Sequence, residues 1–101
     1  MRTILFVQLP LEPFNTAVRN GTAAATMKKI LDDAKPEAAY FTEIDGHRSC
    51  ILVVDLKSAS DIPRFAEPWF LSFNAEVQLR PAMTIEDLAH ADLKSLGKKW
   101  G

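Results

Sequence analysis

The sequence contains one cysteine, Cys50, so it can form neither an internal disulfide nor a cysteine-based metal cluster. It has no cluster of lysine and arginine, and its formal net charge is -1, which argues against a nucleic-acid-binding surface. No apolar run approaches the roughly 20 residues of a membrane-spanning helix. The N-terminal stretch ends in polar and proline residues rather than in the small-residue cleavage site of a signal peptide. These absences predict a reduced, cytoplasmic protein that uses no metal or cofactor and binds neither nucleic acid nor membrane.

What is present fits one domain. The chain has 101 residues, of which 48% are hydrophobic, enough for a single core spanning residues 1–101. A domain of this size leaves much of its surface unburied, so we expect a homodimer.

The first third of the chain predicts a strand followed by helix. Residues 2–9 are apolar and β-branched and end at Pro10, as a strand would. Apolar side chains then keep helical spacing from residue 14 to residue 34, before Pro36. The pattern fits one long helix, or two shorter helices broken at Asn20-Gly21 with Thr22 as a new N-cap.

The dipeptide Asp45-Gly46 predicts a tight β-hairpin between residues 37–44 and 48–56. A two-residue loop places Glu43 opposite Arg48, and these opposite charges support the register. The second strand of the hairpin is apolar on both faces, so it requires cover on both.

The stretch from Asp61 to Val77 raises the question of whether its aromatic residues form a binding surface or a core. Ser60 and Asp61 can cap a helix there. Its apolar residues fall on one helical face across Pro68, which should bend the helix. They are Ile62, Phe65, Ala66, Trp69, Phe70 and Phe73. Such a stripe is typical of a core, and the alternative is that Trp69 or Phe73 lines a cavity.

The last elements complete an α+β fold. Residues 75–83 predict a strand whose end, at Pro81, lies at a sheet edge. Thr84 and Asp87 resemble a capping box at the start of a final amphipathic helix or two short ones. The order is βαββαβ plus C-terminal helix. It predicts a four-stranded antiparallel sheet with two helices on one face and a second copy of the chain on the other.

This layout resembles the ferredoxin-like dimeric α+β barrel superfamily, in which two protomers pack sheet to sheet. More narrowly, "EPFNTAVRNGTA", "KPEAAYFTEIDGHR" and "AEPWFLSFNAEV" resemble a group of small bacterial proteins of unassigned function. The resemblance covers most of the chain and implies a common fold. The superfamily includes cofactor-free monooxygenases, isomerases, haem-degrading enzymes and non-catalytic members, and no catalytic pattern of theirs can be matched here residue by residue.

The predicted topology gathers polar residues at the hairpin end of the sheet. Together with the aromatic Trp69, they are Gln8, Asn15, Glu43, His47, Arg48, Asn74 and Glu76. His47 could move a proton at neutral pH, and Arg48 could hold a carboxylate or enolate. The simpler interpretation is a cross-strand Glu43–Arg48 pair beside a solvated turn histidine. We take His47, Arg48, Glu43, Trp69, Asn15 and Tyr40 as candidate ligand-binding residues, with no catalytic residue assigned.

Two functions follow from this pattern. The first is a homodimeric α+β barrel that binds a small, partly apolar organic molecule, on which cofactor-independent acid–base or oxygen chemistry is possible. The second is a non-catalytic structural or interaction protein whose apolar sheet serves dimerisation alone. The sequence leaves open whether the protein is an enzyme.

Overall fold

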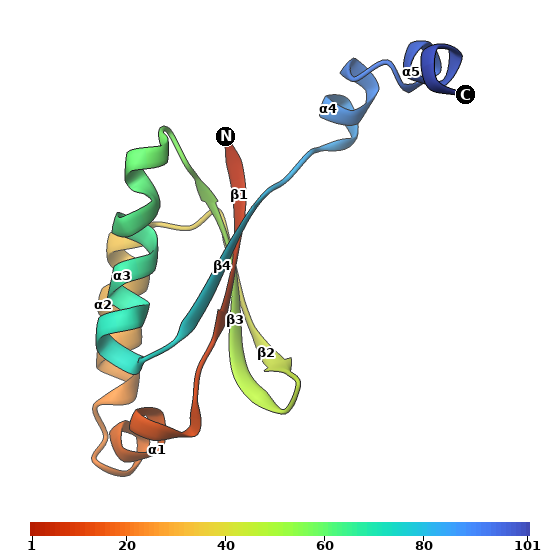
Figure 1. The fold of residues 1–101 in the computed structure, drawn as a ribbon. Helices are drawn as coiled ribbons and strands as arrows, with labels where there is room; N and C mark the ends of the chain where they lie inside the picture. The colour runs from red at the N-terminus through yellow and green to blue at the C-terminus, as the bar shows by residue number, and fades with distance from the viewer.

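The computed structural model describes residues 1–101, and the chain forms one four-stranded sheet, five α-helices and a short 3-10 turn (Figure 1). In chain order these are β1 (Arg2–Gln8), α1 (Leu11–Arg19), α2 (Ala23–Ala34), β2 (Ala38–Ile44), β3 (His47–Asp55), η1 (Ala59–Asp61), α3 (Ile62–Phe73), β4 (Glu76–Pro81), α4 (Ile85–His90) and α5 (Leu93–Trp100). No helix is both long and apolar enough to cross a lipid bilayer.

The sheet is antiparallel throughout, with strand order β2-β3-β1-β4. Strands β1 and β3 occupy the centre, and β2 and β4 form the edges. Helices α2 and α3 cover one face, and α1 lies at the end of the sheet that carries the β2–β3 turn (Figure 1). The α+β class and the four-stranded antiparallel sheet predicted from the sequence are therefore confirmed.

The core lies between the sheet and helices α2 and α3. Alternate residues of the two central strands are buried against the helices, as the two-residue period of a strand requires. They are Thr3, Leu5, Val7, Cys50, Leu52 and Val54. From α3 come Phe65, Ala66, Trp69 and Phe73, all buried, and α3 continues through Pro68. The aromatic stretch is thus the core face of a helix, as predicted.

The helical region after β1 is two helices rather than one. Helix α1 ends at Arg19, and α2 begins at Ala23, after Gly21 adopts a positive φ of 79°. Thr22 occupies the N-cap position, but its side chain accepts no hydrogen bond from the helix. Its hydroxyl donates instead to Asn20 Oδ1 at 2.6 Å, so the break is held by a local turn.

The start of α3 differs in a similar way. Asp61 precedes the helix as predicted, but its side chain accepts no hydrogen bond from the first helical turn. Its carboxylate instead accepts a hydrogen bond from the backbone N–H of Lys57, at 3.3 Å. The oxygen that was expected to cap α3 therefore binds the segment between β3 and η1.

The hairpin has the predicted register, with Glu43 opposite Arg48. Asp45 and Gly46 both have positive φ, 54° and 78°, as the two central residues of a type I′ turn do. Only glycine adopts such angles without steric cost, and aspartate tolerates them better than most residues.

The face of the sheet opposite the helices has no cover. We call it the open face, and its central apolar side chains are Ile4, Phe6, Tyr40, Ile51 and Val53. Four of them are half-buried by their neighbours in the sheet, and Tyr40 is 65% exposed. The bare apolar face expected from the sequence is therefore present.

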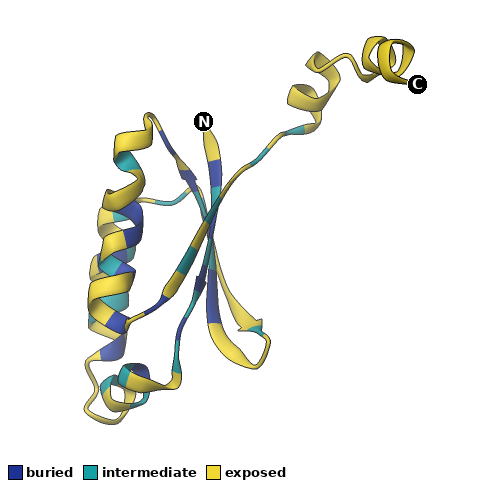
Figure 2. Cartoon of the chain, in the orientation of Figure 1, coloured by how far each residue is buried: buried dark blue, intermediate teal, exposed yellow.

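Residues 82–101 form a C-terminal arm that leaves the body of the molecule and carries α4 and α5 (Figures 1 and 2). None of its residues is buried, and the molecule is 59 Å long but only 28 and 20 Å across. The predicted capping box is present, because Thr84 Oγ1 accepts from Asp87 N and Asp87 Oδ2 accepts from Thr84 N. Of the two predicted alternatives, a single C-terminal helix or two short ones, the second is correct, and neither short helix packs against the core.

Candidate ligand-binding site

The hairpin end of the sheet collects the end of β1, the β2–β3 turn and the start of β4. Gln8 is paired with both Ser49 and Glu76 in the sheet register, which places the three strands side by side there. Backbone alternation then decides on which face each polar side chain lies. The candidate residues fall into two groups, one on the open face and one on the helix side.

His47 lies on the open face. Its Nδ1 is 3.1 Å from Gln8 Nε2 and 3.2 Å from the carbonyl oxygen of Asp45. Gln8 Nε2 also donates to the carbonyl oxygen of Ile44, at 3.1 Å. The side chain of Gln8 in β1 therefore contacts the hairpin turn at both Ile44 and His47. Its contact with Nδ1 orients the His47 ring.

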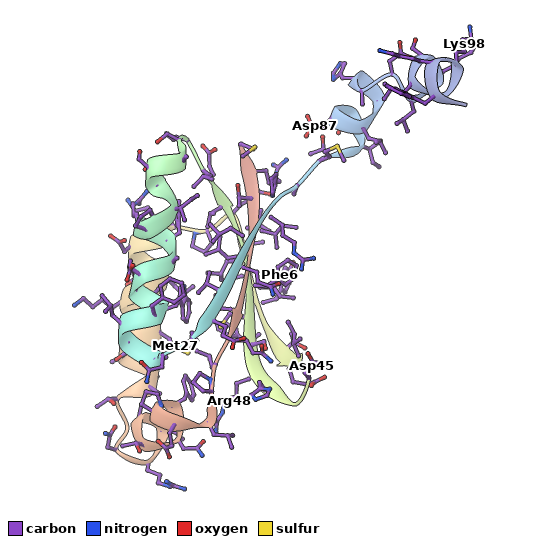
Figure 3. The ribbon with its side chains drawn as sticks, in the orientation of Figure 1. Phe6, Met27, Asp45, Arg48, Asp87 and Lys98 are labelled. Carbon is purple, nitrogen blue, oxygen red and sulfur yellow. The ribbon has the colours of Figure 1, made fainter.

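Arg48 lies on the helix side, toward α1 (Figure 3). Its guanidinium donates to Asn15 Oδ1 at 2.7 Å and lies 4.9 Å from the centre of the Phe14 ring. Glu43 stands opposite Arg48 in the register, but its carboxylate accepts from Gly46 N at 2.8 Å. The register is as predicted, but the side chains of Glu43 and Arg48 bind other partners instead of each other. Arg48 connects α1 to the sheet through its contacts with Asn15 and Phe14.

The two aromatic candidates lie apart from these groups. Trp69 is fully buried, and its ring stands 6.3 Å from that of Phe73. Trp69 Nε1 is buried without a hydrogen-bond acceptor, an uncommon state for an indole N–H. Tyr40 lies on the open face in the edge strand β2. Among the six candidate residues, the side-chain hydrogen bond is the one between Arg48 and Asn15.

A hollow of about 310 Å³ lies on the open face at the hairpin end. Its lining is Phe6, Gln8, Ile44, Asp45, Glu76, Gln78 and Arg80. A smaller hollow of about 160 Å³ adjoins it through Gln8 and Glu76, and is lined further by Pro10, His47 and Asn74. We call the two together the hairpin-end hollow.

The groups around the hairpin-end hollow combine an apolar floor with charges of both signs. Arg80 lies 5.2 Å from the centre of the Phe6 ring, and it donates to Gln78 Oε1 at 3.0 Å. Asp45 and Glu76 supply carboxylates, and His47 supplies an imidazole. Arg80 and Phe6 were not among the residues predicted for the site. The alternating polar series Glu76, Gln78 and Arg80 marks one face of a strand and could have indicated Arg80.

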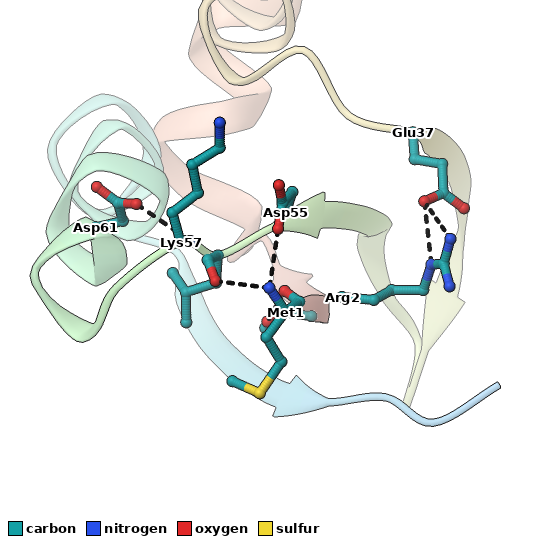
Figure 4. Close-up of polar contacts among 8 residues, drawn as sticks. Met1, Arg2, Glu37, Asp55, Lys57 and Asp61 are labelled. Carbon is teal, nitrogen blue, oxygen red and sulfur yellow. Dashed lines mark hydrogen bonds and ion pairs between the residues drawn. The ribbon is translucent and has the colours of Figure 1, made fainter. Parts of the chain in front are cut away.

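A second hollow, of about 370 Å³, lies at the opposite end of the sheet, between the start of α3 and strands β1 and β4. Its lining is mostly apolar: Met1, Thr3, Leu56, Lys57, Ser58, Ala59, Ile62, Leu79 and Pro81. Figure 4 shows polar contacts near it, in which the amine of Met1 donates to Asp55 Oδ1 and to the carbonyl oxygen of Leu56, each at 2.9 Å. The hydrogen bond from this amine lowers the pKa of the Asp55 carboxyl. No sequence motif indicated this hollow.

Cys50 is the one cysteine of the chain, and it lies in the core. Burial raises the pKa of the Cys50 thiol to about 12, so the thiol is protonated and inaccessible at neutral pH. The structure holds no group of three or more histidine, cysteine, aspartate and glutamate side chains arranged for a metal ion.

No protein-family model matches the chain, and no curated protein matches its sequence.

Proposed function

We propose that the protein is a homodimer of ferredoxin-like protomers, packed sheet to sheet as a dimeric α+β barrel, that binds a small, partly apolar organic molecule in the hairpin-end hollow. One observation carries this proposal: the open face joins an uncovered apolar centre to a hollow with a polar rim. Ligand sites in proteins combine these same two features.

The dimer is supported by the cost of leaving the open face in water. By strand alternation, Ile4, Ile51 and Val53 lie on the face opposite the buried side chains. No element of the same chain covers that face (Figure 1). Burying apolar surface stabilises an association by roughly 25 cal/mol per Å². A second copy laid on this face would also enclose the hairpin-end hollow and exclude water from it.

The chemistry of the hollow suggests the class of ligand. Phe6 and Ile44 offer apolar contact, and Arg80 offers a guanidinium for a carboxylate or enolate. This role was expected for Arg48, which instead lies on the helix side and donates to Asn15. Should the protein be an enzyme, His47 and Glu76 are the groups placed to move a proton without a cofactor.

The second candidate function is a non-catalytic interaction protein, and a specific observation favours it. Gln8 Nε2, Glu43 Oε2 and His47 Nδ1 are already occupied by contacts that hold the hairpin turn. This is what a structural role would require. The two functions differ in whether the enclosed hollow is filled by a ligand or by side chains of the dimer.

The test has two stages. Light scattering at micromolar concentration should give about twice the 11.3 kDa chain mass. Small aromatic and carboxylate-bearing compounds are then screened by thermal shift, and any compound that raises the melting temperature is titrated against the wild type and three variants. Arg80→Ala and His47→Ala should weaken binding, whereas Ile62→Gln, in the second hollow, should not.

A monomer would overturn the dimeric barrel. Weakening by Ile62→Gln alone would place the ligand at the other end of the sheet. A dimer that no compound stabilises would leave the interaction protein as the better supported function.

A further inference from the structure

The C-terminal arm is amphipathic but has nothing to pack against in its own chain. Six of its large apolar side chains are exposed: Met83, Ile85, Leu88, Leu93, Leu96 and Trp100. The most exposed are Ile85 at 85% and Trp100 at 77%. A short helix in water is marginal by itself, and in proteins most helical stability comes from packing its apolar face. Helices α4 and α5 therefore require a surface that this chain does not supply.

The size of the unpacked surface can be estimated. The chain exposes 7021 Å², whereas a compact monomer of 11.3 kDa exposes about 5,700 Å² by the usual scaling, an excess of about 1,300 Å². Its radius of gyration is 16.9 Å, against about 13 Å for a compact domain of this length. The excess exceeds the roughly 800 Å² that each partner buries in a standard protein–protein interface. The arm and the open face together thus offer enough surface for a stable dimer.

The direction of the arm points to its partner. Helices α2 and α3 lie on one side of the sheet, and the arm extends to the other side, the side of the open face (Figure 1). A second copy packed on the open face would occupy the space toward which the arm projects. The arm also continues directly from β4, which is an edge of the sheet, so its apolar surface extends the proposed sheet-to-sheet interface.

Charge supports the same partner. Helix α5 carries Lys94, Lys98 and Lys99 and no acidic residue. The hairpin-end hollow carries two carboxylates, Asp45 and Glu76, and one guanidinium, Arg80. Consider a two-fold axis that lies between the two sheets and runs perpendicular to their strands. Each sheet then places its arm end, where β4 leads into the arm, against the hairpin end of its partner. The lysines of α5 then face the carboxylates of the partner's hollow.

We propose that the C-terminal arms are exchanged in the dimer, so that α4 and α5 of each copy pack against the body of the other copy. This inference rests on the proposed sheet-to-sheet dimer. The exchanged arms add a second part to the dimer interface, in which the arm of each chain covers the hairpin end of its partner.

The two tryptophans allow a direct test with the full-length chain. Trp69 is buried in the core and Trp100 lies at the end of the arm, so Trp69→Phe leaves Trp100 as the only indole while keeping an aromatic ring in the core. Emission from Trp100 and the mass by light scattering are followed together across a dilution series. We expect the emission maximum to shift to shorter wavelength, and acrylamide quenching to fall, over the concentrations at which the mass doubles.

Two arm variants, made in the same Trp69→Phe chain, sharpen the test. Ile85→Glu should raise the dimer dissociation constant about tenfold or more, because a large apolar contact is lost, and it should keep Trp100 exposed. Glu86→Gln changes the neighbouring exposed residue and is the matched control, with little effect expected. Both should keep the circular dichroism of the parent chain, since neither side chain is buried.

Each other result overturns the inference in a distinguishable way. A dimer in which Trp100 stays fully quenchable would retain the sheet-to-sheet interface but not the exchanged arm. A Trp100 that is shielded in a monomer would mean that the arm folds back onto its own body. A monomer with Trp100 exposed at all concentrations would overturn both the arm exchange and the proposed dimer.

Discussion

His47 and Arg48 are neighbours in β3, yet their side chains lie on opposite faces of the sheet. His47 contacts Gln8 on the open face, and Arg48 contacts Asn15 on the helix side. A single ligand held by both residues would therefore have to pass around the end of the hairpin. The two residues therefore have different roles, His47 on the open face and Arg48 in the contact with α1, and each role can be tested by its own substitution.

Arg48→Ala should loosen α1 without changing the open face. The guanidinium contributes a hydrogen bond to Asn15 and a cation–π contact with Phe14, and at exposed sites such a contact is worth about 0.5–1 kcal/mol. We expect a loss of about 1 kcal/mol in the free energy of unfolding, measured with urea. Asn15→Ala should give a similar loss, and the double variant should lose less than the two singles added together. Strict additivity would show that the contact contributes nothing.

Trp69→Ala should be strongly destabilising. Its side chain is fully buried, and deletion of large aromatic side chains from cores costs about 3–5 kcal/mol. Leu71→Ala is the matched control in α3, because Leu71 is 80% exposed, and surface changes of this kind are usually within about 0.5 kcal/mol. Chemical denaturation of the wild type and the two variants gives the change in the free energy of unfolding for each substitution. A Trp69→Ala protein with wild-type stability would contradict the core assignment.

Cys50 should resist alkylation in the native protein. Burial disfavours the thiolate and raises the pKa of the thiol to about 12, so at pH 8 almost no reactive form exists. Iodoacetamide should label Cys50 far more slowly in buffer than in 8 M urea, where the pKa returns toward its usual value of about 8.5. Rapid modification of the folded protein at pH 8 would show that β3 is open to solvent.

Two glycines should respond to alanine in opposite ways. Gly46 has a φ of 78°, where a Cβ is strained by about 1–2 kcal/mol, so Gly46→Ala should lower the stability of the hairpin. Gly97 is helical in α5 with open space around its Cα, so Gly97→Ala should raise helicity. Urea denaturation measures the stability of the Gly46→Ala protein, and circular dichroism measures the helix content of the Gly97→Ala protein. A neutral Gly46→Ala would contradict the type I′ turn.

Much of the body of the fold was predictable because local signals agree there. The turn dipeptide Asp45-Gly46 and the charges of Glu43 and Arg48 set the hairpin register, and the spacing of Phe65, Trp69 and Phe73 set the buried face of α3. The site was less predictable. Proximity in sequence suggested that His47 and Arg48 act together, and strand alternation separates them.

The position of the arm could not be read from the sequence at all. The apolar spacing of Ile85, Leu88 and Leu96 shows that these residues face something. Periodicity does not distinguish a face that packs on its own sheet from one that packs elsewhere. The sequence also left undecided whether one helix or two follow β1. Gly21 is tolerated within a helix as well as at its end, so it did not fix a break there.

The two edges of the sheet differ in how open they are to strand addition. At the β4 edge, Pro81 lacks a backbone N–H, and the strand leads directly into the arm. Strand β2 has neither protection: it contains no proline, its middle five residues are exposed, and its sequence includes the run from Ala38 to Phe41. Unpaired N–H and C=O groups along such an edge are a template for another strand. Of the two edges, β2 is therefore the one at which we expect a strand from another chain to add.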